Sequence, residues 1–292
     1  MRTPFLVASW IPVGIGIGLV HHQNKHVNLF YAVLTFISVT LLHLGSNLAN
    51  DYFDHITGND EANTSVTPFS GGSRVIQDGL INSKTIYTAA LYLLSAGTIT
   101  GIYLAIRTQT IPVFVCGLTG LIIAYFYTAK PLQFGYHGVG ELLAGIAFGP
   151  LVVIATYCIQ TKYFHSCAVF YSIPTGLMVS MILLINEFPD YQADKTAAKN
   201  TLVVLLGKKR SLFLLCFLLT LPYIYLYTAY LFKIISHGSL LAYIPIPVAS
   251  YIFYKSIRTY DDPIAIIPAC GAMIVMYTLT GLLLISGLIF FK

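Results

Sequence analysis

Two clusters of acidic and amide side chains carry the strongest chemical signal in this sequence. The first runs from Asn47 to Asp54 and the second from Asn186 to Asp194. Segments 51–78 and 187–194 hold 8 of the 11 Asp and Glu residues of a chain in which 9% of the residues are charged. Carboxylates are costly in apolar surroundings unless a cation offsets their charge. The clusters therefore predict a functional site.

The types and spacing of these side chains favour a magnesium site built from two halves. Within each half, two aspartates lie three or four residues apart, which places them on one face of a helix. Carboxylate and amide oxygens suit Mg²⁺, which is commonly shared with substrate phosphates, and no His or Cys lies at the spacing that zinc requires. Ordinary solvated loop carboxylates are the less favoured alternative. The candidates are the metal ligands Asp51, Asp54, Asp190 and Asp194 and the neighbouring amides Asn47, Asn50 and Asn186.

A metal bound by carboxylates needs an anionic ligand, and two basic residues could help to bind one. In the segment 69–74, paired glycines allow backbone amides to approach phosphate oxygens, and Arg74 can bind them bidentately. Lys130 follows an aromatic segment, and a topology role at the membrane interface is its alternative. Together with the two acidic clusters, these residues predict a diphosphate site whose ligand carries a long apolar tail.

The elements that position these residues are predicted to be membrane-spanning helices. The chain has 292 residues, is 57% hydrophobic and has a mean hydropathy of +0.77. Its apolar stretches have the length of roughly 20 residues that spans a bilayer. We therefore expect an all-α integral membrane protein with one domain over residues 1–292. The nine predicted spans are 5–20, 27–49, 85–106, 111–129, 140–159, 166–188, 211–232, 239–258 and 264–290.

The charges predict the orientation of these nine spans. One side of the membrane receives 11 Lys and Arg residues and all 11 acidic residues, whereas the other side receives 5 Lys and Arg residues. The positive-inside rule makes the first side cytoplasmic. We therefore expect a protein of the cytoplasmic membrane, surrounded by lipid, with its site facing the cytoplasm. The net charge of +5 reflects this bias and indicates no nucleic-acid partner.

Taken together, these motifs resemble those of the UbiA superfamily of intramembrane prenyltransferases, nearest to its menaquinone-biosynthesis branch, the 1,4-dihydroxy-2-naphthoate polyprenyltransferases. The resemblance covers essentially the whole chain. It implies nine helices in a horseshoe around a central cavity, a lateral opening to lipid, and an Asp-rich site for Mg²⁺ and diphosphate under a cytoplasmic cap of loops. The motifs that carry it are 47–60, 71–74, 140–141, 148–150, 186–194 followed by Lys195, and 200–207.

The resemblance also implies a reaction. Two Mg²⁺ ions held by the four aspartates, with Asn50 and Asn186 assisting, would bind a polyprenyl diphosphate, while Arg74 and Lys130 neutralise the leaving group. The allylic cation then attacks an aromatic acceptor, whose ring carboxylate is lost in the menaquinone branch. Tyr127 is a candidate for shielding the cation, with packing as its alternative. The other candidates are Asn47 and Lys195 for binding substrate.

Glu141 is the candidate for orienting or deprotonating the acceptor. Complementing the amino terminus of a helix explains this residue equally well. Both interpretations stay open at the level of the sequence.

Departures from the branch pattern bear on the acceptor. The branch usually reads Asn-Asn-x-Arg-Asp in its second motif, whereas this chain has Asn186-Glu-Phe-Pro-Asp190. 1,4-Dihydroxy-2-naphthoate is the acceptor we expect, and 4-hydroxybenzoate, homogentisate and geranylgeranylglyceryl phosphate are the alternatives. A cation-coupled transporter is the alternative from another class. Transporter acids usually lie at the bilayer midplane, whereas these lie at the ends of spans.

Overall fold

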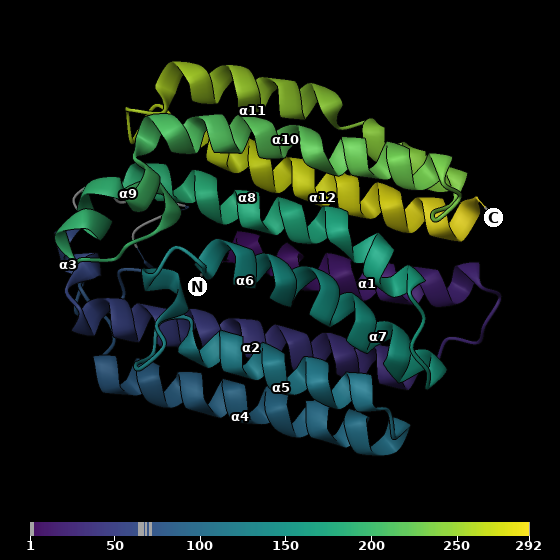
Figure 1. Cartoon of the computed structure of the whole chain (residues 1–292). Helices are drawn as coiled ribbons and strands as arrows, with labels where there is room; N and C mark the ends of the chain where they lie inside the picture. The colour runs from purple at the N-terminus through teal and green to yellow at the C-terminus, as the bar shows by residue number, and fades with distance from the viewer. Residues whose placement is uncertain (1–2, 64–66, 68, 70–71, 292) are drawn as a thin grey trace.

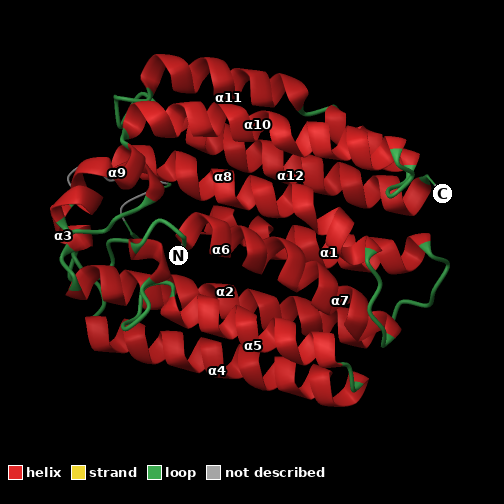
Figure 2. Ribbon diagram, viewed as in Figure 1, coloured by secondary structure: helices red, strands yellow, loops and turns green. Residues whose placement is uncertain are grey.

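The computed structural model describes residues 3–63, 67, 69 and 72–291, and the elements within those ranges are helices (Figures 1 and 2). The long helices lie side by side in one bundle (Figure 1). In chain order they are η1 (Thr3–Leu6), α1 (Val7–His22), α2 (Leu29–Ile56), α3 (Asn59–Ala62), α4 (Ser83–Thr108), α5 (Ile111–Phe126), η2 (Phe134–Tyr136), α6 (Gly140–Ile146), η3 (Ala147–Leu151), α7 (Val152–Thr161), α8 (Cys167–Thr196), α9 (Leu202–Leu206), α10 (Lys208–Leu231), η4 (His237–Tyr243), α11 (Ile246–Thr259) and α12 (Ile267–Phe290).

The apolar helices account for the membrane prediction. Within the described residues, seven helical segments are long and apolar enough to cross a bilayer, and α1 and α5 are shorter apolar helices that coincide with the first and fourth predicted spans. Large apolar side chains such as Leu29, Phe30 and Ile111 are exposed on the outside of the bundle, where lipid would cover them. The all-α membrane class is confirmed. The count of nine spans and the horseshoe arrangement stay predictions.

Both acidic clusters lie on helices that extend beyond the predicted spans. We expected loops to begin at residues 50 and 189, but α2 continues to Ile56 and α8 to Thr196. Polar side chains do not end a helix by themselves, and each helix ends only just before a left-handed residue, Gly58 at φ 75° or Ala198 at φ 53°. Both clusters therefore lie at the same end of the bundle, beside α3 and α9 (Figure 1).

Close packing of α2 against α4 sets the orientation of the first cluster. A Cβ atom on Gly45 would lie 2.8 Å from Leu94, and one on Gly97 would lie 3.0 Å from the carbonyl oxygen of Ser38. The Ser38 hydroxyl donates to the carbonyl oxygen of Gly97 at 2.8 Å. Glycines that permit such close approach are typical of helix pairs in membranes. The contact fixes which face of α2 is turned toward the interior.

Pro150 lies within a π-helical segment, η3, between α6 and α7. Here the chain passes close to α8, because a Cβ atom on Gly149 would lie 2.6 Å from the Cα atom of Gly176. Wide turns of this kind relieve the clash that proline causes within a helix. The segment carries Phe148 to the wall of the cavity described below.

Candidate active site

A cavity of about 400 Å³ lies between α2, α4, α5, η3, α7 and α8. Its walls are largely apolar, as a binding site for a hydrocarbon chain requires. The carboxylate side chains and the lysine that line it lie where α2 and α8 end, beside α3 and α9. The polar residues lining that end are Asn47, Asn50, Asp54, Asn59, Asp60, Asn186, Glu187, Asp190, Asp194, Lys199 and Thr201.

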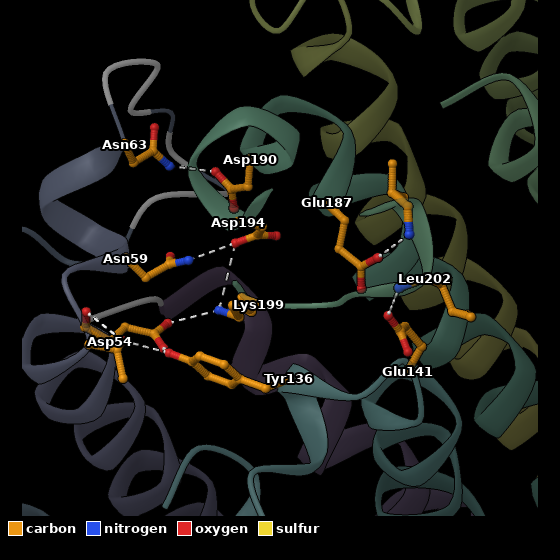
Figure 3. A network of polar contacts seen from close by, with 12 residues as sticks. Asp54, Asn59, Asn63, Tyr136, Glu141, Glu187, Asp190, Asp194, Lys199 and Leu202 are labelled. Carbon is orange, nitrogen blue, oxygen red and sulfur yellow. Dashed lines mark hydrogen bonds and ion pairs between the residues drawn. The ribbon is translucent and has the colours of Figure 1, made fainter. Parts of the chain in front are cut away.

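Lys199 joins the two acidic clusters at this end of the cavity (Figure 3). Its Nζ atom lies 3.0 Å from Oδ2 of Asp54 and 4.0 Å from Oδ1 of Asp194. Burial by itself lowers the pKa of Lys199, but the two carboxylates outweigh it and hold the pKa well above its usual value. The lysine therefore stays protonated and offsets the charge of two carboxylates from different helices.

A tyrosine from the segment between α5 and α6 completes the contacts of Asp54. The Tyr136 hydroxyl donates to Oδ1 of Asp54 at 2.6 Å and lies 2.8 Å from the hydroxyl of Thr57. The Nζ atom of Lys199 lies 5.2 Å from the centre of the Tyr136 ring. Burial and the neighbouring Asp54 raise the pKa of Tyr136, so the ring stays a neutral hydrogen-bond donor.

Two asparagines after α2 bind the carboxylates of α8. Asn59 donates from Nδ2 to Oδ1 of Asp194 at 2.9 Å, and Asn63 donates from Nδ2 to Oδ1 of Asp190 at 2.6 Å (Figure 3). The left-handed Gly58 turns the chain directly before α3, which points these amides toward α8. The chain that follows the first acidic cluster thus orients the second.

Two glutamates bind the beginning of α9. Oε1 of Glu141 accepts the backbone N–H of Leu202 at 3.0 Å, and Oε2 of Glu187 accepts that of Val203 at 3.3 Å (Figure 3). Glu141 is buried outside the residues that line the cavity, whereas Glu187 lines it. The contact of Glu141 agrees with the helix-terminus interpretation of that residue.

Most of the predicted site residues come together at this cavity, and the others lie around it. Asp51 is buried and accepts the backbone N–H of Ser73 at 3.3 Å. Arg74 donates from Nη1 to the backbone carbonyl oxygen of Asp60 at 2.8 Å, which places it beside the cavity. The exposed side chains of Lys130 and Lys195 are not among the lining residues. The predicted residues that line the cavity are Asn47, Asn50, Asp54, Tyr127, Asn186, Asp190 and Asp194.

The predicted phosphate cradle is described only in part. Ser70 and Gly71 lie outside the described residues. Gly72 lines the cavity at φ 73°, and a Cβ atom there would lie 2.5 Å from Oδ2 of Asp60. Only glycine fits this position, which brings the backbone close to the polar end of the cavity.

The sequence reasoning missed Lys199, Tyr136, Asn59 and Asn63. Lys199 had a usable signal, since it directly precedes the 200–207 motif. Lys195, the substrate-binding candidate from the sequence, is exposed and does not line the cavity. Whether Lys199 returns to the cavity depends on Ala198, whose left-handed backbone reverses the chain after α8, and alanine gives no hint of this conformation.

The donor set at this end fits magnesium. Within the described residues, no three or more His, Cys, Asp or Glu side chains converge tightly enough to hold a metal by themselves. However, Oδ1 of Asn186 is buried without a hydrogen-bond partner, and its side chain lines the cavity between the aspartates of α8 and the apolar wall. Carboxylate and amide oxygens facing a polar pocket, with room for a phosphate to supply further ligands, are the set that Mg²⁺ prefers.

The bundle, the apolar cavity and its acidic end together suit an intramembrane enzyme. Residues 9–265 match the UbiA prenyltransferase family, and the chain belongs to that family. It is therefore a prenyltransferase.

Relatives with named activities are similar over most of the chain. The 1,4-dihydroxy-2-naphthoate octaprenyltransferase of Bacillus subtilis is 30% identical over 77% of this chain and 70% of its own length. The Haemophilus influenzae protein of the same name is 32% identical over 64% of this chain and 61% of its own length. UbiA prenyltransferase domain-containing protein 1 of Dictyostelium discoideum is 29% identical over 76% and 67%.

Solved structures support the fold over nearly the whole chain. A UbiA homolog from Archaeoglobus fulgidus bound to GPP and Mg²⁺ has a TM-score of 0.68 at 18% identity, covering 98% of this chain and 97% of its own. The apo structure of a UbiA homolog from Aeropyrum pernix has a TM-score of 0.71 at 13% identity, covering 96% and 97%.

Proposed function

We propose that the protein transfers a polyprenyl group from a polyprenyl diphosphate to 1,4-dihydroxy-2-naphthoate, with loss of the ring carboxylate, in a step that requires Mg²⁺. The observation that carries this proposal is the single continuous cavity with an acidic, lysine-bridged end and apolar walls. A diphosphate suits the first part and a prenyl chain suits the second.

The polar end supplies both signs of charge that a diphosphate site needs. Asp54, Asp190 and Asp194, with Asn50 and Asn186, would hold Mg²⁺ there, and the ion would neutralise the diphosphate as it leaves. Lys199 would bind the leaving diphosphate directly, because its ammonium group lies between the clusters and faces the cavity. These residues come from both helix ends, so the site is complete only when α2 and α8 are docked together.

The remaining basic candidates surround this end. Arg74 lies against Asp60, and from there its guanidinium would contact the outer phosphate. Lys130 and Lys195 stay candidates for the same role, and both would have to turn inward from exposed positions.

The apolar walls would bind the prenyl chain and exclude water from the allylic cation. Gly117 and Gly120 line the cavity one turn apart on α5, and nothing lies within 4 Å of a Cβ atom built on either. Tyr127 directly follows α5 and also lines the cavity. Its ring would present an aromatic face to the cation.

The choice of acceptor is supported by the relatives. Naphthoate octaprenyltransferases from two bacteria are 30% and 32% identical to this chain, which favours 1,4-dihydroxy-2-naphthoate over the other acceptors. We place the protein in the cytoplasmic membrane with this site facing the cytoplasm, on the basis of the charge asymmetry of the connections.

An acceptor screen tests this proposal. The purified protein in nanodiscs would receive geranylgeranyl diphosphate, Mg²⁺ and one of four acceptors: 1,4-dihydroxy-2-naphthoate, 4-hydroxybenzoate, homogentisate or geranylgeranylglyceryl phosphate. We expect a decarboxylated prenyl-naphthol by mass spectrometry. Product with only another acceptor would overturn the naphthoate assignment and keep the enzyme class. Magnesium-dependent binding without any product would reopen the transporter alternative.

A further inference from the structure

Glu187 lies on the cavity face of α8, one turn below Asp190 and two turns below Asp194 toward the apolar interior. Spacings of three and four residues put the three side chains on one face of the helix. With a rise of about 1.5 Å per residue, Glu187 lies roughly 4.5 Å below Asp190 along the helix axis. The next lining residue beyond Asn186 is Leu183. Glu187 therefore marks the level between the diphosphate end and the apolar wall.

Asn47 marks the corresponding level on α2. It lies seven residues before Asp54, as Glu187 lies seven residues before Asp194, and both helices run toward the same end of the bundle (Figure 1). Asn47 lines the cavity, and its Nδ2 atom is buried without a hydrogen-bond partner among the described residues. This level of the cavity thus offers a carboxylate from one helix and an amide donor from the other.

Glu141 shows that contact with α9 does not explain the position of Glu187. Both glutamates accept one backbone N–H at the start of α9, from Leu202 or Val203. Only Glu187 also lines the cavity. If binding α9 were the whole role of Glu187, its carboxylate would need no access to the cavity.

We propose that Glu187 accepts a hydrogen bond from a hydroxyl group of the aromatic acceptor and thereby helps to select that acceptor. This inference rests on the function proposed above. The reacting carbon of the prenyl chain is bonded to the diphosphate, so it must lie directly below the aspartates, and the acceptor ring must reach it there. A carboxyl oxygen accepts a hydrogen bond from a hydroxyl group. A hydroxyl of the ring therefore faces Glu187, and the amide of Asn47 can donate to an oxygen on the other side of the ring.

The test compares Glu187→Gln with Glu141→Gln in nanodiscs. Glutamine keeps one oxygen for the N–H of α9 and replaces the other with an NH₂ group, which cannot accept a hydrogen bond, so each variant retains its backbone contact. The acceptors would be 1,4-dihydroxy-2-naphthoate and its two monomethyl ethers, each of which lacks one hydroxyl group. Binding of geranylgeranyl diphosphate and the thermal unfolding temperature would show that each variant is folded.

We expect the wild-type protein to use one of the two ethers at least about tenfold less efficiently than the parent acceptor, because that ether cannot donate to Glu187. In Glu187→Gln, the KM for the parent acceptor should rise about tenfold, the KM for geranylgeranyl diphosphate should stay within about twofold, and the discrimination against that ether should shrink. Any loss of turnover in Glu141→Gln should fall equally on all three acceptors.

The outcomes separate this inference from the proposed function. No prenylated product from the wild-type protein with any acceptor overturns both. Product from the wild-type protein, with the same discrimination between acceptors in Glu187→Gln, overturns the inference alone. If Glu187→Gln does not fold, Glu187→Asp takes its place, since it keeps both carboxyl oxygens but withdraws them by one methylene group and should change the same ratio.

Discussion

The acidic ends of α2 and α8 share a sequence pattern but differ in how they present their carboxylates. On α8, both Asp190 and Asp194 line the cavity, and neutral amides of Asn63 and Asn59 bind them. On α2, Asp54 lines the cavity, whereas Asp51 accepts a backbone N–H from Ser73 outside it. Two similar clusters therefore make unequal contributions to one site.

Helix geometry explains the difference. Residues four apart are separated by about 40° around a helix, whereas residues three apart are separated by about 60° in the opposite direction. Asn50 and Asp54 are four apart, as are Asp190 and Asp194, and all four line the cavity. Asn47 lies three residues before Asn50, as Glu187 lies three residues before Asp190, and both also line the cavity. Asp51 directly follows Asn50 and lies about 100° around α2 from it, off the face that the two helices share.

Neutralising single aspartates should lower kcat/KM most strongly and should affect the two clusters unequally. We expect Asp54→Asn, Asp190→Asn and Asp194→Asn each to lower kcat/KM by about a thousandfold, because each removes a charged ligand facing the cavity. Asp51→Asn should lower it by about tenfold or less. Steady-state kinetics with saturating Mg²⁺ would measure all four variants.

An equal loss for Asp51→Asn would contradict this ranking. It would mean that Asp51 turns into the cavity when substrate binds, as the prediction of four metal ligands implies. Unfolding temperatures of the four variants are the control, since Asp51 is buried and its amide variant must still accept the N–H of Ser73.

Lys199 should give the next largest effect. Replacing it with methionine removes the cation that lies 3.0 Å from Asp54 and 4.0 Å from Asp194. We expect kcat/KM to fall by about a hundredfold, through weaker binding of the diphosphate and uncompensated repulsion between the carboxylates. Replacing the exposed Lys195 with methionine should change kcat/KM only a few-fold. A larger loss of kcat/KM in Lys195→Met than in Lys199→Met would support the prediction from the sequence that Lys195 binds substrate.

Removing the amides that hold Asp190 and Asp194 should act more weakly. The double variant Asn59→Ala, Asn63→Ala deletes hydrogen bonds of 2.9 and 2.6 Å to these carboxylates. Removing a group that orients a metal ligand typically lowers the affinity for the metal by about tenfold or more. We expect the Mg²⁺ concentration for half-maximal activity to rise about tenfold.

The control for the asparagine pair is Asn82→Ala. Asn82 caps α4, where its side chain accepts the backbone N–H of Lys84 at 2.9 Å. Its removal should lower the unfolding temperature and leave the Mg²⁺ requirement unchanged. If both sets of variants shift the Mg²⁺ requirement alike, the amides of Asn59 and Asn63 act through stability rather than through the carboxylates.

The sequence predicted those parts of the molecule that depend on composition and regular spacing. Apolar stretches of spanning length gave the class of fold, and the spacing of Asp54, Asp190 and Asp194 placed them on helix faces that do converge at one cavity. Residues 9–265 then matched the family that the motifs had suggested. Composition and spacing were enough for the fold class and the helix faces, because a membrane leaves few alternatives to the helix, whereas the family came from the resemblance of the motifs.

The parts that could not be predicted depend on how the chain turns after each helix. Gly58 directs Asn59 toward α8, and Ala198 returns Lys199 to the cavity. Tyr136 reaches Asp54 across 82 residues of sequence. Such contacts follow from tertiary packing, and no local pattern distinguishes these side chains from other polar residues in loops.

The smallest effect is expected at the outer side of the α2 end, where His55 contacts Glu61 away from the cavity. Burial alone would raise the pKa of Glu61, but the hydrogen bonds from His55 and Gln77 outweigh it and lower the pKa below its usual value of 4.5. The contribution of the ionised Glu61 to the stability of the folded state is therefore present above pH 4.5 and is lost as the pH falls through the lower pKa of the folded state.

Because the pair is largely exposed, Glu61→Gln should cost no more than about 0.5 kcal/mol at pH 7. Thermal unfolding in detergent should show a small decrease at pH 7 that disappears near the acid limit, while kcat/KM stays unchanged. A loss of activity would instead place Glu61 in the site. The end of α2 would then contribute a further side chain to the site besides Asp54, Asn47 and Asn50.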